Sequence, residues 1–361
     1  MPLILAMLGL LLTGHSAAAA DTTYAEKAAA LVQSYVDADR FSGAVLVALD
    51  GKPIFRQGFG LANREWGVAN TPETKFRTGS IGKQFAAASV LRLAERGKLG
   101  LDDPISKHYD AAPLAWSKIT LRHLLSMRSG IPNFTKIPDF FVNPSKAEHT
   151  PEQVIALTRD QPLRFEPCTR YEYSNSGYIL IGSVIEKVTG GSYGRYLRES
   201  IFSPLGMTGS GYEDNETVIP NRASGYRIDR GQWKIAMYIS MSVVFSAGAT
   251  FTTVDDLLRW EQALGRDGFL GADSRRAMFT NYGGGYRLAW GISNLFGNPV
   301  QMHSGSIHGF HTTLCRYPED KLTIIVLANL ESAPSLWIAN ELASLHFGIL
   351  RTAMRPCLYE S

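Results

Sequence analysis

Strand-forming sequence lies near the two ends of this 361-residue chain, and helix-forming sequence fills most of the space between them. Residues 41–48 follow a strand pattern, Asp50-Gly51 is a type I′ turn signal, and residues 53–58 return as a second strand. Further strand-like runs are residues 285–292, 310–316 and 322–330. One sheet assembled from both ends of the chain, with an inserted helical lobe, accounts for this order. The expected fold class is therefore α/β, of the α+β type.

Helix signals define the inserted lobe and the remaining elements. Thr150-Pro151-Glu152-Gln153 is a capping box with proline at the first helical position. Gly97 and Gly190 each follow an apolar helical run, as a C-terminal glycine does. The expected helices are residues 24–36, 80–96, 121–127, 151–159, 178–188, 192–201, 254–264 and 332–347. We expect a sheet domain of residues 21–80 and 236–361 and a helical subdomain of residues 81–235.

Composition narrows the classes of partner. The chain is 45% hydrophobic and 19% charged, which suits a globular fold with a large core. Its net charge of +3 and the lack of a basic run argue against nucleic-acid binding. The three cysteines, Cys168, Cys315 and Cys357, leave at least one thiol free or paired with another molecule. Cys315 lies in an apolar strand-like run and is expected to pack as a small hydrophobic residue.

The first twenty residues resemble an export signal. Residues 3–12 form an apolar core too short to span a bilayer, and Ala18-Ala19-Ala20 provides small residues before Asp21. No basic residue precedes the apolar core, so a short hydrophobic helix kept in the mature protein is the alternative. We expect residues 1–20 to be removed, the protein to be periplasmic or secreted, and no later segment to anchor it in a membrane.

The first candidate catalytic residues are Ser80 and Lys83. On a helix these two residues lie one turn apart on the same face, where the amine can take the proton of the hydroxyl if burial keeps it neutral. The helix N-terminus adds backbone N–H groups that can bind an oxyanion. The spacing alone also fits a simpler interpretation, in which Ser80 caps the helix and Lys83 is solvated.

Two further motifs favour the chemical interpretation. Tyr173-Ser174-Asn175 and His303-Ser304-Gly305 follow in the order typical of penicillin-recognising serine hydrolases. The chain thus resembles the class C β-lactamase-related serine hydrolases, which include β-lactamase-like carboxylesterases, D-aminopeptidases and D-alanyl-D-alanine carboxypeptidases. The resemblance implies a β-lactamase/transpeptidase-like fold, with an antiparallel sheet flanked by helices beside an all-helical subdomain, and an active site between them.

The resemblance also implies roles for individual residues. Ser80 would be the acylated nucleophile, and Lys83 and Tyr173 would move protons, either through a neutral lysine or through a phenolate stabilised by a lysine ammonium. Asn175 and His303 would position the substrate. Gly305, on an edge strand, would let the substrate backbone approach closely. The N–H groups of Ser80 and Ser306 would form the oxyanion hole. Cys168 stands where related sequences usually have glycine.

His303 bears on the substrate, because true β-lactamases have lysine at this position. A histidine is mostly neutral at pH 7, so it favours esters or amides that lack an obligatory carboxylate. We therefore expect an exported serine hydrolase that acts on a small-molecule or peptide substrate through an acyl-enzyme, without a cofactor. The alternatives are a D-Ala peptide carboxypeptidase, a class C-type β-lactamase, and a penicillin-binding sensor with little turnover.

Two other patterns are expected to carry no chemistry. Gly190-Gly191-Ser192-Tyr193-Gly194 matches a nucleophile-elbow pattern, but it joins two helices instead of a strand and a helix, so Ser192 is expected to be a helix cap. His303, His308 and His311 have spacings that fit neither one helix face nor one strand face, so no metal site is expected.

Overall fold

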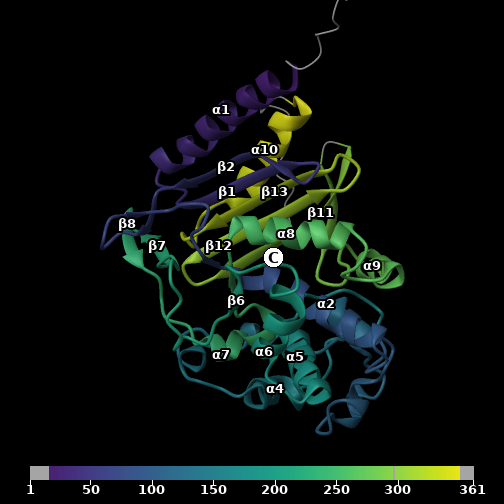
Figure 1. Cartoon of the computed structure of the whole chain (residues 1–361). Coiled ribbons are helices and arrows are strands. Elements are labelled where there is room, and N and C mark those ends of the chain that lie inside the picture. The colour runs from purple at the N-terminus through teal and green to yellow at the C-terminus, as the bar shows by residue number, and fades with distance from the viewer. Residues whose placement is uncertain (1–15, 296, 350–361) are drawn as a thin grey trace, which may run out of the picture.

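The computed structural model describes residues 16–295 and 297–349 and is built around a six-stranded antiparallel sheet (Figure 1). The strand order is β10-β11-β12-β13-β1-β2, so the N-terminal hairpin adds to one edge of a sheet formed by the C-terminal strands. This confirms the sheet assembled from both ends of the chain. The strands are β1 (Gly43–Leu49), β2 (Lys52–Phe59), β10 (Gly291–Leu295), β11 (Asn298–Ile307), β12 (Phe310–Tyr317) and β13 (Leu322–Ala328).

Helices cover both faces of the sheet and lie in the lobe below it (Figure 1). They are α1 (Ser16–Asp37), α2 (Gly82–Glu95), α3 (Leu121–Leu125), α4 (Pro151–Arg159), α5 (Asn175–Thr189), α6 (Tyr193–Leu197), α7 (Met241–Val244), α8 (Val254–Gly265), α9 (Ala272–Phe279) and α10 (Ser335–Phe347). Short strands elsewhere are β3 (Leu61–Asn63), β4 (Val68–Ala69), β5 (Phe76–Arg77), β6 (Gly211–Tyr212), β7 (Tyr226–Asp229), β8 (Gln232–Ile235) and β9 (Thr250–Thr252).

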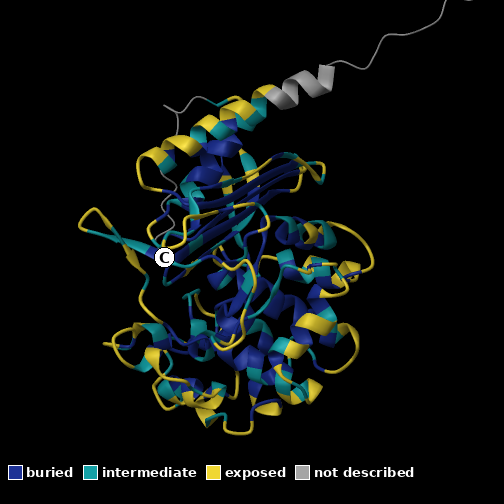
Figure 2. Cartoon of the chain, turned by 60° about the vertical axis from the view of Figure 1, so that its left-hand side comes forward, coloured by how far each residue is buried: buried dark blue, intermediate teal, exposed yellow. Residues whose placement is uncertain are grey.

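The central strands are buried on both faces because different helices pack on each side (Figure 2). Along β1, Val45 and Val47 belong to a core shared with α1 and α10, whereas the intervening Leu46 belongs to the core shared with α8. Successive strand side chains point to opposite faces, so this alternation follows from the strand geometry. The turn between β1 and β2 has positive φ at both Asp50 and Gly51, as the predicted type I′ turn requires.

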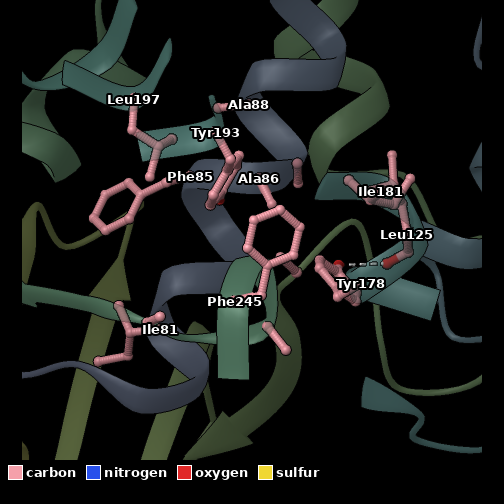
Figure 3. Close-up of a cluster of buried hydrophobic side chains, with 14 of the residues drawn as sticks. Ile81, Phe85, Ala86, Ala88, Leu125, Tyr178, Ile181, Tyr193, Leu197 and Phe245 are labelled. Carbon is pink, nitrogen blue, oxygen red and sulfur yellow. Dashed lines mark hydrogen bonds between the residues drawn. The ribbon is translucent and has the colours of Figure 1, made fainter. Parts of the chain in front are cut away.

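Helix α2 runs through the centre of the lower lobe and holds the start of the predicted active site in place. Phe85 on α2 packs edge-on against Phe202 and Trp260, with ring centroids 5.1 and 4.9 Å apart. Figure 3 shows side chains from neighbouring segments gathered around the same helix, among them Tyr178 of α5, whose hydroxyl donates to the Leu125 carbonyl at 2.8 Å. Close packing of this kind fixes the segment that immediately precedes α2.

Several predicted boundaries were wrong. Residues 285–290 do not form a strand, because a turn with positive φ at Ala289 buries Leu288 and Trp290, and β10 begins only at Gly291. The C-terminal helix starts at Ser335 instead of residue 332, because Pro334 is its N-cap. The helix predicted for residues 121–127 ends at Leu125, and positive φ at Met127 turns the chain away. The strands β6, β7 and β8 lie within residues 81–235 and were not anticipated.

Some predictions concern residues that the structure does not describe. Most of the expected export signal, residues 1–20, and Cys357 lie outside the described residues, although α1 already begins at Ser16. Within residues 16–295 and 297–349, no helix has both the length and the apolar character needed to cross a bilayer. In the same part of the chain Cys168 is exposed, and Cys315 is buried as expected; burial raises the pKa of its thiol to about 12.

Candidate active site

Ser80 lies in a single 3-10 turn, Gly79–Ile81, directly before α2. A positive φ of 52° at Gly79 turns the chain into this position, and the Thr78 N–H donates to the Thr250 carbonyl at 2.8 Å. Ser80 Oγ is 3.0 Å from Lys83 Nζ and 2.8 Å from the Tyr173 hydroxyl. The structure therefore brings together the three residues that the sequence predicted to carry the chemistry.

Lys83 is completely buried, so the interpretation of this residue as a solvated lysine is wrong. Its Nζ lies 2.8 Å from Asn175 Oδ1 and 2.7 Å from the Ala247 carbonyl oxygen. Among the described residues it forms no ion pair with a carboxylate, and burial lowers its pKa well below the ordinary value of 10.5. Burial also raises the pKa of the Tyr173 phenol. Both effects favour a neutral amine beside a neutral phenol over an ammonium beside a phenolate.

The hydrogen bonds are consistent with that neutral pair. A neutral amine has two N–H donors, which suit Asn175 Oδ1 and the Ala247 carbonyl, and one lone pair, which then faces the Ser80 hydroxyl. The Tyr173 O–H can donate to Ser80 Oγ. Asn175 is the first residue of α5, and its backbone N–H donates to Asn133 Oδ1 at 3.2 Å, which holds the side chain next to Lys83.

The 3-10 turn that carries Ser80 packs closely against β11 beside the backbone nitrogens of Ser80 and Ser306. A Cβ atom on Gly79 would lie 3.0 Å from Ser306 N, and a Cβ atom on Gly305 would lie 3.0 Å from Ser80 N. Two N–H donors directed at one point bind the oxygen of a tetrahedral intermediate, which is the role predicted from the sequence for this pair.

Gly305 also has a packing role within the protein. A Cβ atom at this position would lie 1.9 Å from the Thr78 carbonyl oxygen, so the glycine admits a neighbouring protein segment. The expected edge position holds only in part: β10 pairs with residues 298–302 of β11, and this sheet has no strand beyond Met302 on that side among the described residues. The 3-10 turn carrying Ser80 packs there instead.

His303 lies next to Tyr173, and it is only 7% exposed. Its Nδ1–H donates to the Ser304 carbonyl at 2.6 Å, so its Nε2 accepts from the Tyr286 hydroxyl at 2.8 Å. Tyr286 in turn packs edge-on against Tyr173, with ring centroids 6.2 Å apart. Burial lowers the pKa of His303 to about 3. The imidazole is therefore neutral, and both nitrogens are already used within the protein.

A pocket of about 390 Å³ opens beside Ser80. Its lining includes Asn175 and Ser306 but neither Tyr173 nor His303. The remaining lining is mainly apolar and aromatic. It comprises Gly79, Phe134, Thr135, Phe140, Phe141, Ile239, Val243, Val244, Ala247, Ile307, His308 and Glu331.

The two patterns expected to be without chemistry can also be placed in the structure. Ser192 precedes α6, and its Oγ accepts from the Arg195 N–H at 3.3 Å, which confirms it as a helix cap. His311 Nδ1 is 2.7 Å from Ser335 Oγ, on a different strand from His303. Over the described ranges, no group of three or more His, Cys, Asp or Glu side chains is arranged to hold a metal ion.

Sequence reasoning missed several residues around Ser80. Ala247, Asn133, Tyr286 and Glu331 come from four separate segments and contribute through a backbone carbonyl, an amide, a phenol and a carboxylate. None of them has a partner at fixed spacing in the sequence, so only the fold brings them to the site.

Comparison with known proteins agrees with this geometry. The chain matches the β-lactamase family over residues 28–345 and belongs to that family. A penicillin-binding protein of Bacillus subtilis (strain 168) is 28% identical over 330 residues, which cover 83% of this chain and 71% of that protein. The octameric penicillin-binding protein homologue from Pyrococcus abyssi is 29% identical with a TM-score of 0.80, covering 90% of this chain and 77% of that one.

A D-stereospecific amidohydrolase from Streptomyces sp. is 25% identical with a TM-score of 0.75, covering 92% of this chain and 99% of that one. The protein thus has the β-lactamase/transpeptidase-like fold, as the sequence motifs predicted, and is a hydrolase of a serine hydrolase family.

Proposed function

We propose that this protein cleaves an ester or amide through an acyl-enzyme formed on Ser80. The observation that carries the proposal is that Ser80 Oγ contacts two buried groups, the Lys83 amine and the Tyr173 hydroxyl. Burial favours the neutral form of both. A buried neutral amine is a competent general base at neutral pH, whereas a solvated lysine is not.

The contacts suggest the order of proton transfers. Ser80 Oγ forms a bond to the carbonyl carbon while its proton moves to Lys83 Nζ, and the carbonyl oxygen becomes an oxyanion held by the N–H groups of Ser80 and Ser306. The bond to the leaving group then breaks, and the leaving atom takes the proton of the Tyr173 hydroxyl. Lys83 returns its proton to Tyr173, which restores the neutral pair. Water repeats these steps in place of Ser80 and releases the carboxylic acid.

His303 supports a substrate without an obligatory carboxylate. Where true β-lactamases have a lysine ammonium, this chain has a buried imidazole that carries no charge and no free hydrogen-bonding nitrogen. A carboxylate-bearing ligand would thus lack a charge-assisted hydrogen bond, worth about 1.5–3 kcal/mol. This favours simple esters and amides over penicillins and D-Ala-D-Ala peptides.

A penicillin-binding sensor is the second candidate, because a penicillin-binding protein is among its relatives. The two functions differ in deacylation, so the test is a panel of p-nitrophenyl esters, D-peptides and β-lactams followed from the first turnover. A burst that continues into steady-state hydrolysis of the esters is expected. A stoichiometric burst with no further turnover would support the sensor instead. Fast steady-state cephalosporin hydrolysis with negligible ester turnover would contradict the substrate assignment.

A further inference from the structure

Glu331 is the one acidic residue in the lining of the pocket that opens on Ser80. It follows β13, and its own backbone N–H donates to the Tyr226 carbonyl at 2.9 Å, which fixes the position of the residue. Among the described residues its carboxylate receives one long hydrogen bond, from the Gly309 N–H at 3.4 Å. The carboxylate is therefore placed by the fold but is only weakly satisfied within it.

No cation among the described residues forms an ion pair with this carboxylate. Within residues 16–295 and 297–349, no lysine, arginine or histidine forms an ion pair with Glu331. Arg77, which is close enough to His308 to influence it, pairs with the buried Glu213 at 2.5 Å, and Arg222 pairs with the same carboxylate. Burial lowers the pKa of His308, the neighbouring residue in the lining, so its imidazole stays neutral.

The pocket receives the acyl half of the substrate if Ser80 acts as proposed. The leaving group must lie next to the Tyr173 hydroxyl, which protonates it, and Tyr173 does not line the pocket, whereas Ser80, Asn175 and Ser306 do. An acyl group whose carbonyl oxygen is held by the Ser80 and Ser306 N–H groups then enters the pocket between Asn175 and Ser306. Glu331 consequently faces the acyl group, together with walls that are mostly phenylalanine and aliphatic side chains.

We propose that Glu331 binds an ammonium group on the acyl half of the substrate. This inference rests on the proposed function of Ser80. The preferred substrates are then esters or amides of amino acids that carry a free amino group and an apolar side chain. A charge-assisted hydrogen bond of this kind in a partly enclosed pocket corresponds to roughly a ten- to hundredfold gain in kcat/KM over the same acyl group without the amine.

The test compares p-nitrophenyl esters of phenylalanine, as separate enantiomers, with the p-nitrophenyl ester of 3-phenylpropionic acid, which differs only by the amino group. Rates are measured at about pH 6.5, below the usual pKa of an α-amino group of roughly 7.7–8.0. The wild type should prefer one phenylalanine ester by ten- to hundredfold. Glu331→Gln, which keeps the shape and the acceptor for Gly309, should reduce this ratio to within about threefold of unity. Glu331→Asp, which withdraws the carboxylate by one methylene, should give an intermediate ratio.

Glu319→Gln is the matched control, because Glu319 is an exposed residue in the turn between β12 and β13 and should leave the ratio at the wild-type value. Equal rates for all esters in the wild type, or an undiminished preference in Glu331→Gln, would overturn the inference and leave the hydrolase assignment intact. No turnover of any ester by the wild type would overturn the hydrolase assignment, and this inference with it.

Discussion

Replacing His303 by lysine should destabilise the protein, although lysine is the residue that true β-lactamases have at this position. A pKa of about 3 instead of 6.5 means that charging the buried imidazole costs about 5 kcal/mol. A lysine ammonium at the same place meets a similar penalty, partly relieved if its flexible chain reaches the cleft. Lysine also removes the acceptor of the Tyr286 hydroxyl, a loss of about 1–3 kcal/mol. We expect a net loss of roughly 2–5 kcal/mol.

The assay is thermal or denaturant unfolding, and a loss of this size should lower Tm by roughly 5–15 °C in a protein of this length. His303→Gln is the matched control, because its amide oxygen can accept from Tyr286 without adding a charge, so its loss should stay below about 2 kcal/mol. A His303→Lys variant with wild-type Tm and increased turnover of carboxylate-bearing substrates would refute the reasoning. It would show that this side chain reaches the substrate.

Three further predictions concern the proton relay, its pH dependence and the packing at Gly305. Lys83→Met and Tyr173→Phe should each lower kcat by on the order of 10²–10³. In the double variant the loss of transition-state free energy should be much smaller than the sum of the two single losses, because both residues serve one proton path. Steady-state kinetics measures these values. In the wild type, kcat/KM should rise with pH as the Lys83 ammonium deprotonates, at a pH well below 10.5, because burial lowers its pKa. A pH profile that rises only near pH 10.5 would argue against a buried base. Gly305→Ala should cost about 1–3 kcal/mol in stability by driving β11 away from Thr78 and should lower kcat further, which unfolding and rate measurements on one sample can check.

The sequence predicted the fold class and the central contacts because these depend on local spacing. Lys83 lies one helical turn from Ser80, so a helix at this point is sufficient to bring the two side chains together. The Asp50-Gly51 turn likewise requires positive φ at two adjacent residues, which determines the hairpin locally. Tyr173 could be assigned only through its family motif, since ninety-three residues separate it from Ser80 in the chain.

What the sequence could not predict depends on long-range packing. The substrate role expected for His303 assumed a free imidazole, but Tyr286 occupies its Nε2 and the sheet buries the ring. No sequence pattern near His303 indicates that Tyr286 contacts it. Tyr286 comes from a buried turn whose composition resembles that of a strand. Glu331 follows a buried strand as an ordinary polar residue, and only the tertiary arrangement places it in the pocket beside Ser80. Side-chain environment, not local pattern, decides each of these cases.

The central claim is that Ser80 forms the covalent intermediate, and mapping the adduct of a fluorophosphonate probe tests it most directly. Intact mass should show one adduct per chain, and peptide mapping should place it on Ser80, because among the described residues this is the serine hydrogen-bonded to the buried Lys83. Ser80→Ala should prevent labelling and lower kcat by on the order of 10³ or more, whereas Ser192→Ala should stay within a few-fold of the wild type. An adduct on Ser192 or on another residue, or full turnover by Ser80→Ala, would contradict the account.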